Sequence, residues 1–158
     1  MNFDFIKISR ATFIIAIICF FLPWIQLSCG SHHVNLNGID FVTGKTLSDG
    51  RHINSVPEVV IAFLLALAGI AITFARGKFA NTKLVSIGTA VAGAIGSLLL
   101  YRFKGQLYNA FLIEKEQGNI FPGVELHYRY GLYLTMLSFI AAFLIGVYSL
   151  KRQVHDTK

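Results

Sequence analysis

Three residues with metal-binding side chains lie close together in the sequence, in the pattern Cys29-x-x-His32-His33. Thiolate and imidazole groups are good ligands for zinc or copper, and this spacing could place them around one ion. His52 and His127 could complete a tetrahedral set. Adjacent histidines in a strand point to opposite faces, so only one of the pair readily shares the side of Cys29. We therefore expect no cofactor, and a zinc or copper site at Cys29, His32 and His33 is the alternative.

Other kinds of chemistry have no reaction centre in this sequence. Cys19 precedes Cys29 by ten residues, which is about 15 Å along a helix and too far for a disulfide. The sequence has no Cys-x-x-Cys, phosphate-binding loop or Ser/His/Asp set. Carriers usually have ionisable residues at membrane depth, and the apolar segments contain no acidic or basic residue well inside their ends, which disfavours ion-coupled transport. We predict that the protein is not an enzyme.

The composition is that of an integral membrane protein. Of the 158 residues, 54% are hydrophobic and only 14% are charged, whereas soluble domains carry about a quarter charged residues. Four apolar runs approach or exceed the length of about 20 residues that crosses a bilayer. We predict a bundle of four transmembrane helices, over residues 11–28, 57–75, 84–104 and 131–150. The remaining segments are an outside loop at 29–56, an inside turn at 76–83, an outside segment at 105–130 and a tail at 151–158.

The basic residues predict the orientation of this bundle. With a cytoplasmic N-terminus, the inside segments carry eight Lys or Arg residues against two Asp residues, and the outside segments carry six basic against six acidic residues. This bias follows the positive-inside rule, and it predicts a multi-pass membrane protein with both termini in the cytoplasm. The net charge of +6 therefore fits contact with anionic lipid headgroups, and we expect no nucleic acid partner.

Two rows of small side chains lie on the third apolar run, and each row repeats every four residues. The rows are Gly88, Ala92 and Gly96, and beside them Thr89, Gly93 and Ser97. Small rows let helix backbones approach closely in lipid, where no hydrophobic force draws helices together. We expect these residues to pack the third helix against its neighbours, or against a helix of another protein.

Aromatic residues mark the expected membrane surface. Pro23 is expected to kink or end the first helix, which places Trp24 at headgroup depth with its indole N–H toward water. Tyr101, Tyr130 and Tyr133 are expected in the same outer belt.

The outside segments carry strand patterns. Asn37-Gly38 lies between alternating apolar residues, which is a strong signal for a β-hairpin. The second outside segment begins as an extension of the third helix. It then alternates strictly over residues 124–130, which predicts a half-buried strand that runs directly into the fourth helix. Because an isolated hairpin is marginal in water, we expect the two outside segments to share one small antiparallel sheet. Ser55 and Glu58 fit a capping box at the start of the second helix, with Pro57 in its first turn.

Short stretches of the chain resemble small uncharacterised bacterial inner-membrane proteins. They are FLPW at 21–24, SCG at 28–30, GIDFVTG at 38–44 and YGLYL at 130–134. The order of helices and strands is similar to the claudin arrangement, although only Cys29 is available outside and the claudin loop disulfide is missing. The resemblance implies a fold and a compartment, and it implies no tight-junction function.

These observations predict an accessory or scaffold protein. Its partners would be the lipid bilayer and either another membrane protein or a second copy, bound through the helices and the extracytoplasmic sheet. A metal-binding protein and a module that binds lipid or a small molecule between cap and bundle are the alternatives.

Overall fold

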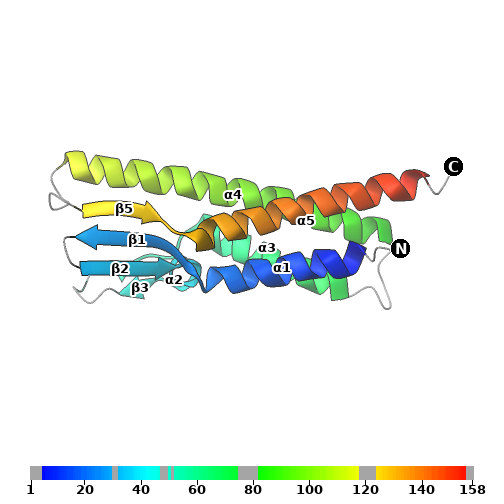
Figure 1. Ribbon diagram of the computed structural model, residues 1–158, viewed down its shortest axis with the longest axis horizontal. Helices are drawn as coiled ribbons and strands as arrows, with labels where there is room; N and C mark the ends of the chain where they lie inside the picture. The colour runs from blue at the N-terminus through cyan, green and yellow to red at the C-terminus, as the bar shows by residue number, and fades with distance from the viewer. Residues whose placement is uncertain are drawn as a thin grey trace.

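The computed structural model describes residues 5–29, 32–46, 50, 52–74, 82–117 and 124–155. Within these ranges, long helices run side by side and the strands gather at one end of the molecule (Figure 1). The long helices are α1 (Phe5–Phe20), α3 (Pro57–Phe74), α4 (Thr82–Glu116) and α5 (Tyr130–His155). Helix α1 begins and α5 ends at the end of the molecule opposite the strands (Figure 1).

Three helices in the described part of the chain are long and apolar enough to cross a membrane, namely α3, α4 and α5. They coincide with the second, third and fourth predicted spans, and they confirm the prediction of transmembrane helices. Helix α1 has 16 residues, which is about 24 Å against a hydrocarbon core of about 30 Å. It is not among the three.

The predicted first span over 11–28 is wrong at both ends. The helix begins by Phe5 and ends at Phe20, and β1 (Pro23–Cys29) follows it. Proline has no N–H to donate and disfavours helical backbone in the residue before it, so the helix cannot continue through Pro23. The apolar residues beyond Pro23 therefore belong to the sheet and not to the membrane helix.

A three-stranded antiparallel sheet has the strand order β2-β1-β5, in which β2 is His32–Asn37 and β5 is Val124–Tyr128. It joins two distant segments of the chain, as predicted for a shared outside sheet. In β5, Leu126 and Tyr128 pack against the core, whereas Glu125 and His127 are exposed. The strand leads directly into α5, as the alternating pattern predicted. A second, two-stranded sheet pairs β3 (Lys45–Thr46) with β4 (His52–Ile53).

The predicted hairpin at Asn37-Gly38 is wrong. Asn37 ends β2, and Gly38 begins the short helix α2 (Gly38–Thr43). The carboxylate of Asp40 accepts a hydrogen bond of 2.9 Å from the backbone N–H of Asn37, which caps the start of this helix. Glycine is needed at position 38 because an added Cβ would lie 2.4 Å from the Trp24 ring.

The predicted capping box at the start of α3 is also wrong. Pro57 is the first residue of the helix, as expected. The backbone N–H groups of Val59 and Val60 both donate to the carbonyl of Val56, so the capping position is Val56 and not Ser55.

Candidate functional site

The strand register places the three predicted metal ligands next to one another in the β1–β2 pair. Cys29 pairs with His32, and Ser28 pairs with His33. Of the three side chains, the structure describes that of His33. The Nδ1 atom of His33 lies 3.0 Å from the hydroxyl of Ser28, within hydrogen-bonding distance. The zinc or copper site stays a prediction.

The two histidines that could complete the metal set lie with other partners. In the two-stranded sheet, His52 Nδ1 lies 3.0 Å from the hydroxyl of Thr46. In β5, His127 Nε2 lies 3.0 Å from the carboxylate of Glu125. Among the residues whose placement is described, no three His, Cys, Asp or Glu residues are grouped closely enough to hold a metal ion.

The outer face of the three-stranded sheet is polar. Arg129 donates a hydrogen bond to the side-chain oxygen of Gln26, which joins the end of β5 to β1. The Glu125–His127 pair lies on the same face and is exposed. Pairs of this kind at the surface contribute about 1 kcal/mol or less to stability. This face therefore offers hydrogen-bonding groups to solvent or to a partner.

Trp24 contradicts its predicted place in the interface belt. Its side chain is fully buried, and its indole N–H donates a hydrogen bond of 2.9 Å to the carbonyl of Cys19. The last carbonyls of a helix have no partner within the helix, and the indole satisfies one of them at the end of α1. Trp24 is therefore a core residue between the bundle and the sheet.

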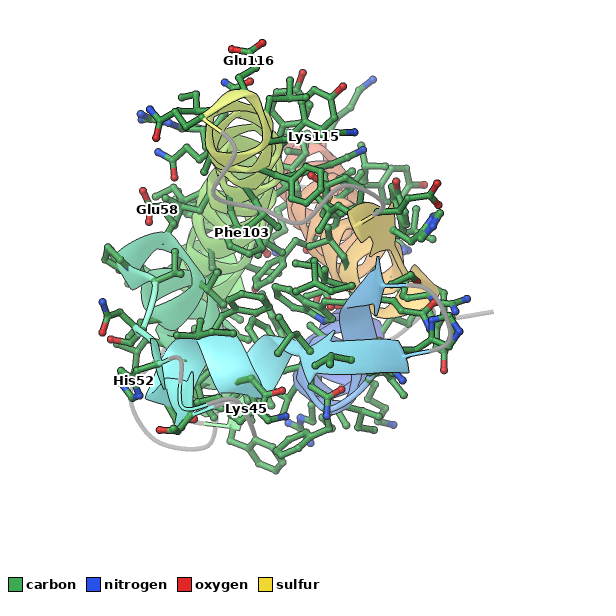
Figure 2. The ribbon with its side chains drawn as sticks, turned by 90° about the vertical axis from the view of Figure 1, so that its left-hand side faces the viewer. Lys45, His52, Glu58, Phe103, Lys115 and Glu116 are labelled. Atoms are coloured by element: carbon green, nitrogen blue, oxygen red, sulfur yellow. The ribbon has the colours of Figure 1, made fainter. Side chains whose placement is uncertain are left out.

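Aromatic rings from distant parts of the chain surround Trp24. We call this set the aromatic junction, and it consists of Phe20, Trp24, Phe41, Phe63 and Phe103. The ring centroid of Trp24 lies 4.9 Å from that of Phe20 and 6.2 Å from that of Phe103. Phe103 also meets Phe41 of α2 at 5.2 Å. Figure 2, which looks onto the sheet end of the molecule, shows Phe103 in the interior beneath α4.

Two glycines allow the backbone to close around the junction. At Gly38 an added Cβ would lie 2.4 Å from the Trp24 ring. At Gly131, in the first turn of α5, it would lie 2.6 Å from the carbonyl oxygen of Pro23 and 2.8 Å from Trp24. Real Cβ atoms almost never approach other atoms so closely, so α2, β1 and α5 are held tightly against one indole. Packed side chains thus fill the space around Trp24, and a ligand groove elsewhere between cap and bundle stays a prediction.

The three tyrosines predicted for the outer belt are exposed. Tyr101, Tyr130 and Tyr133 expose 68%, 55% and 47% of their surface. Beside them, the amine of Lys104 lies 4.8 Å from the ring centroid of Tyr133 and 5.3 Å from that of Tyr128. An amine this close to an aromatic face is attracted to it. Lys104 of α4 and Tyr133 of α5 therefore form an aromatic and cationic contact where these two helices meet.

Tyr128 is less exposed than its neighbours, and its hydroxyl donates a hydrogen bond of 3.0 Å to the backbone carbonyl of Lys104. Burial raises the pKa of Tyr128, and the charges of Tyr133 and Tyr108 raise it further. Because the neutral phenol is favoured, Tyr128 keeps its proton and joins β5 to α4.

The small rows of α4 face the other helices of the same chain. At Gly93 an added Cβ would lie 2.5 Å from the backbone nitrogen of Phe143, and at Gly96 it would lie 2.5 Å from the ring of Phe139. Gly88 faces Ile72 of α3 at 3.4 Å. Ala92 is buried, and the hydroxyls of Thr89 and Ser97 donate to backbone carbonyls of α4 itself.

Arg10 is a residue whose role the sequence did not reveal. Its guanidinium donates a hydrogen bond of 2.9 Å to the backbone carbonyl of Thr73, near the C-terminal end of α3, and lies 3.9 Å above the ring of Phe74. A cation at a helix C-terminus satisfies an orphan carbonyl and opposes the negative end of the helix dipole. The role was hidden because Arg10 and Thr73 are 63 positions apart.

Helix α4 is longer than a bilayer is thick. Its 35 residues span about 52 Å, and its apolar part, 84–101, spans about 27 Å at 1.5 Å per residue. The rest runs alongside the strands toward Lys115 and Glu116 at its tip (Figures 1 and 2). On this part Tyr108, Leu112 and Ile113 are 51%, 38% and 53% exposed. Apolar surface exposed outside lipid usually marks an interaction site.

A comparison with models of protein families and a comparison with curated proteins each found no match to this chain. The fold therefore indicates the class of the protein. Within the described residues, three helices are long and apolar enough to cross a membrane, and a small antiparallel sheet lies at one end of the bundle.

Proposed function

We propose that this chain is a non-enzymatic scaffold of the cell inner membrane. It has four membrane-spanning helices, cytoplasmic termini and an extracytoplasmic cap. It binds another membrane protein or a second copy through the outer surfaces of its helices and cap.

The exposed side chains of α1 support its place as a fourth span. Along and just beyond this helix, large apolar residues are 37–58% exposed, namely Ile8, Ile14, Ile15, Ile18 and Phe21. In water, apolar surface of this kind costs about 25 cal/mol per Å², and lipid removes this cost. Helix α1 also packs against α3 and α5, which are long enough to span.

The distribution of charge supports the orientation. Lys7, Arg10, Lys83, Lys151 and Arg152 lie on the parts of α1, α4 and α5 that are farthest from the strands (Figure 1). The positive-inside rule assigns such an end to the cytoplasm. The sheets and the tip of α4 would then lie outside.

The aromatic junction is the observation that carries the proposal. Trp24 is fully buried between strand and helices, and Gly38 and Gly131 leave no room for even one added carbon beside it. Interiors packed to this density transmit force and do not rearrange freely. The cap is therefore fixed to the bundle and presents its outer surface at a constant height above the membrane, which is what a scaffold requires.

Purification tests this function. The tagged full chain is extracted in mild detergent, and its mass is determined by native mass spectrometry. We expect a stoichiometric partner or a defined homo-oligomer. Trp24→Ala should lose the association because the cap loosens, whereas Leu137→Ala, on the lipid-facing side of α5, should retain it. A wild-type chain that is monomeric under every gentle extraction contradicts the proposal.

Metal binding is a narrower alternative, and the register that pairs Cys29 with His32 favours it. Elemental analysis of the purified chain tests it directly. Near-stoichiometric zinc or copper that is lost in Cys29→Ser supports a metal site, and an absence of both metals removes the idea.

A further inference from the structure

The exposed face of α4 carries an apolar repeat of seven residues. One series recurs every seven positions, and a second series follows each member of the first by three positions. The first series is Leu84, Val91, Leu98, Gly105 and Leu112, and the second is Ile87, Ala94, Tyr101 and Tyr108. Alternating steps of three and four residues have the period of 3.5 that is typical of helices that pair side by side. We call this face the α4 seam.

Eight of the nine positions of the α4 seam are exposed, and Ala94 is intermediate. Leu84, Val91 and Leu98 are 63%, 50% and 60% exposed, and Tyr108 and Leu112 are 51% and 38% exposed. Lipid would cover the first three, because they lie in the apolar part of the helix. It would not cover Tyr108 and Leu112, which lie beyond Arg102 and Lys104 on the projecting part. The seam therefore continues past the point at which lipid can be its partner.

Gly105 is the observation that points to a second helix. It lies inside α4 and does not have a positive φ, and an added Cβ would meet nothing within 4 Å. A glycine inside a helix costs about 1 kcal/mol relative to alanine. The other described glycines of α4, at positions 88, 93 and 96, each face a neighbour in the same chain. No contact with the described residues accounts for Gly105, whereas the close approach of another backbone would.

We propose that the α4 seam pairs in parallel with the α4 seam of a second copy, and that Gly105 is the point of closest approach. This inference rests on the proposed function and names the partner. A partner helix can cover the seam from Leu84 to Leu112 only if it extends beyond the lipid as far as α4 does. Two copies in one membrane share their orientation, so each seam meets its own residues at equal height.

The charged residues that flank the seam are compatible with this pairing. In a parallel pair, the residue just before a member of the first series lies beside the residue five positions later on the other helix. Ser97 would then face Arg102 of the second copy, and Lys104 would face Asn109. In this pairing the residue opposite each cation is a neutral hydrogen-bonding group, and the amine of Lys104 also lies over the rings of Tyr133 and Tyr128 of its own chain.

Cysteine cross-linking in isolated membranes tests the geometry. In a Cys29→Ser background, Leu112→Cys and Tyr108→Cys place thiols on the seam, and Ala110→Cys places one on the opposite side of the helix at the same height. A disulfide needs Cα atoms within about 7 Å, so the seam variants should form at least about tenfold more dimer than the control. Equal cross-linking at all three positions overturns the seam.

Gly105→Leu provides a test that needs no added cysteine. The space around position 105 is open in one chain, so the variant should fold, whereas the dissociation constant of the dimer should rise at least about tenfold because the backbones are forced apart. Gln106→Leu, at the neighbouring exposed position, should leave the dissociation constant unchanged. If Gly105→Leu also leaves it unchanged, the inference is overturned and the scaffold function stands. If Leu112→Cys cross-links to a different protein, the second copy is likewise overturned, whereas a monomer with no partner contradicts both proposals.

Discussion

Two groups of aromatic residues lie at the same end of the helix bundle, and they differ completely in exposure. In the aromatic junction, Trp24 and Phe20 are fully buried, whereas Tyr101 and Tyr130 are more than half exposed. Both groups lie near the point where apolar helices end, which is why the sequence analysis placed Trp24 in one belt with Tyr101, Tyr130 and Tyr133. An aromatic residue at the end of an apolar run thus predicts a position near the end of the bundle. The path of the backbone then decides whether its ring faces inward or outward.

The backbone path differs because α1 ends before Trp24 and α4 continues past Tyr101. Pro23 turns the chain into β1, and β1 lies over the end of the bundle, so Trp24 points into the core. Tyr101 stays on a regular helix, and its place on the outer face is fixed by the helical repeat. The experiments below use this contrast.

The largest effect is expected from removing the buried ring. Trp24→Ala should destabilise the fold by about 3–5 kcal/mol, because it leaves a large cavity and removes one of the two hydrogen bonds that the Cys19 carbonyl accepts. Tyr101→Ala should change stability by about 0.5 kcal/mol or less, because its side chain is on the surface. Chemical unfolding in detergent micelles, followed by circular dichroism, measures both. Similar losses for the two variants would contradict the contrast.

A smaller loss is expected from adding one carbon at the junction. Gly131→Ala should cost about 1–3 kcal/mol, because the new methyl group meets the carbonyl of Pro23 and the Trp24 ring. Trp24 is the only tryptophan in the sequence, so its fluorescence emission should shift to longer wavelength as water reaches it. Gly105→Ala is the matched change in open space, and at concentrations where the chain is monomeric it should stabilise the helix by about 1 kcal/mol. An unshifted emission in Gly131→Ala would show that the junction is loose.

The cap of α2 should contribute less than the junction. Asp40→Asn weakens the hydrogen bond to the N–H of Asn37 and removes the ion pair with Lys45, which should cost about 1 kcal/mol. Hydrogen exchange of the α2 amides should speed up, while the amides of α5 remain protected. Glu116→Gln, at the exposed tip of α4, serves as the control without a cap. Unchanged exchange in α2 would rule out a capping role for Asp40.

The smallest effect is a dependence on high pH at the edge of the junction. The pKa of Tyr128 is raised above its ordinary value of 10.0, so the folded state holds this proton more tightly than the unfolded state. The stability from this group is complete below the unfolded pKa, and it is lost as the pH rises through the raised folded pKa. Ultraviolet titration should show one late tyrosinate step that Tyr128→Phe removes and Tyr101→Phe does not. Titration of all tyrosines together would contradict the burial of Tyr128.

The parts of the fold that the sequence predicted depend on local patterns. The second, third and fourth spans follow from uninterrupted apolar runs, and β5 follows from strict alternation over a few residues. The end of the first span could not be placed in the same way, because apolar residues such as Trp24, Ile25 and Leu27 continue past Pro23. The Asn37-Gly38 hairpin failed for a related reason. Gly38 serves contact with Trp24, and a turn preference cannot reveal such a contact.

The candidate site was predictable only in part. The rows of small residues on α4 marked a close-packed face, but the sequence could not say whether the neighbour was α3, α5 or another protein. The grouping of Cys29, His32 and His33 followed from their spacing along the chain, and the strand register pairs Cys29 with His32 and Ser28 with His33. Arg10 at the end of α3 was invisible, because the contact depends on two helices meeting.

By itself, the sequence determined that the long apolar helices of this protein suit a lipid environment. Hydropathy and charge add up residue by residue, so apolar runs and basic flanks specify membrane helices before any of them touch. The tertiary structure decided which residues are buried between cap and bundle, and it decided which glycines of α4 already have a neighbour. Those properties depend on atoms brought together from distant parts of the chain, because a side chain is buried only by whatever packs over it.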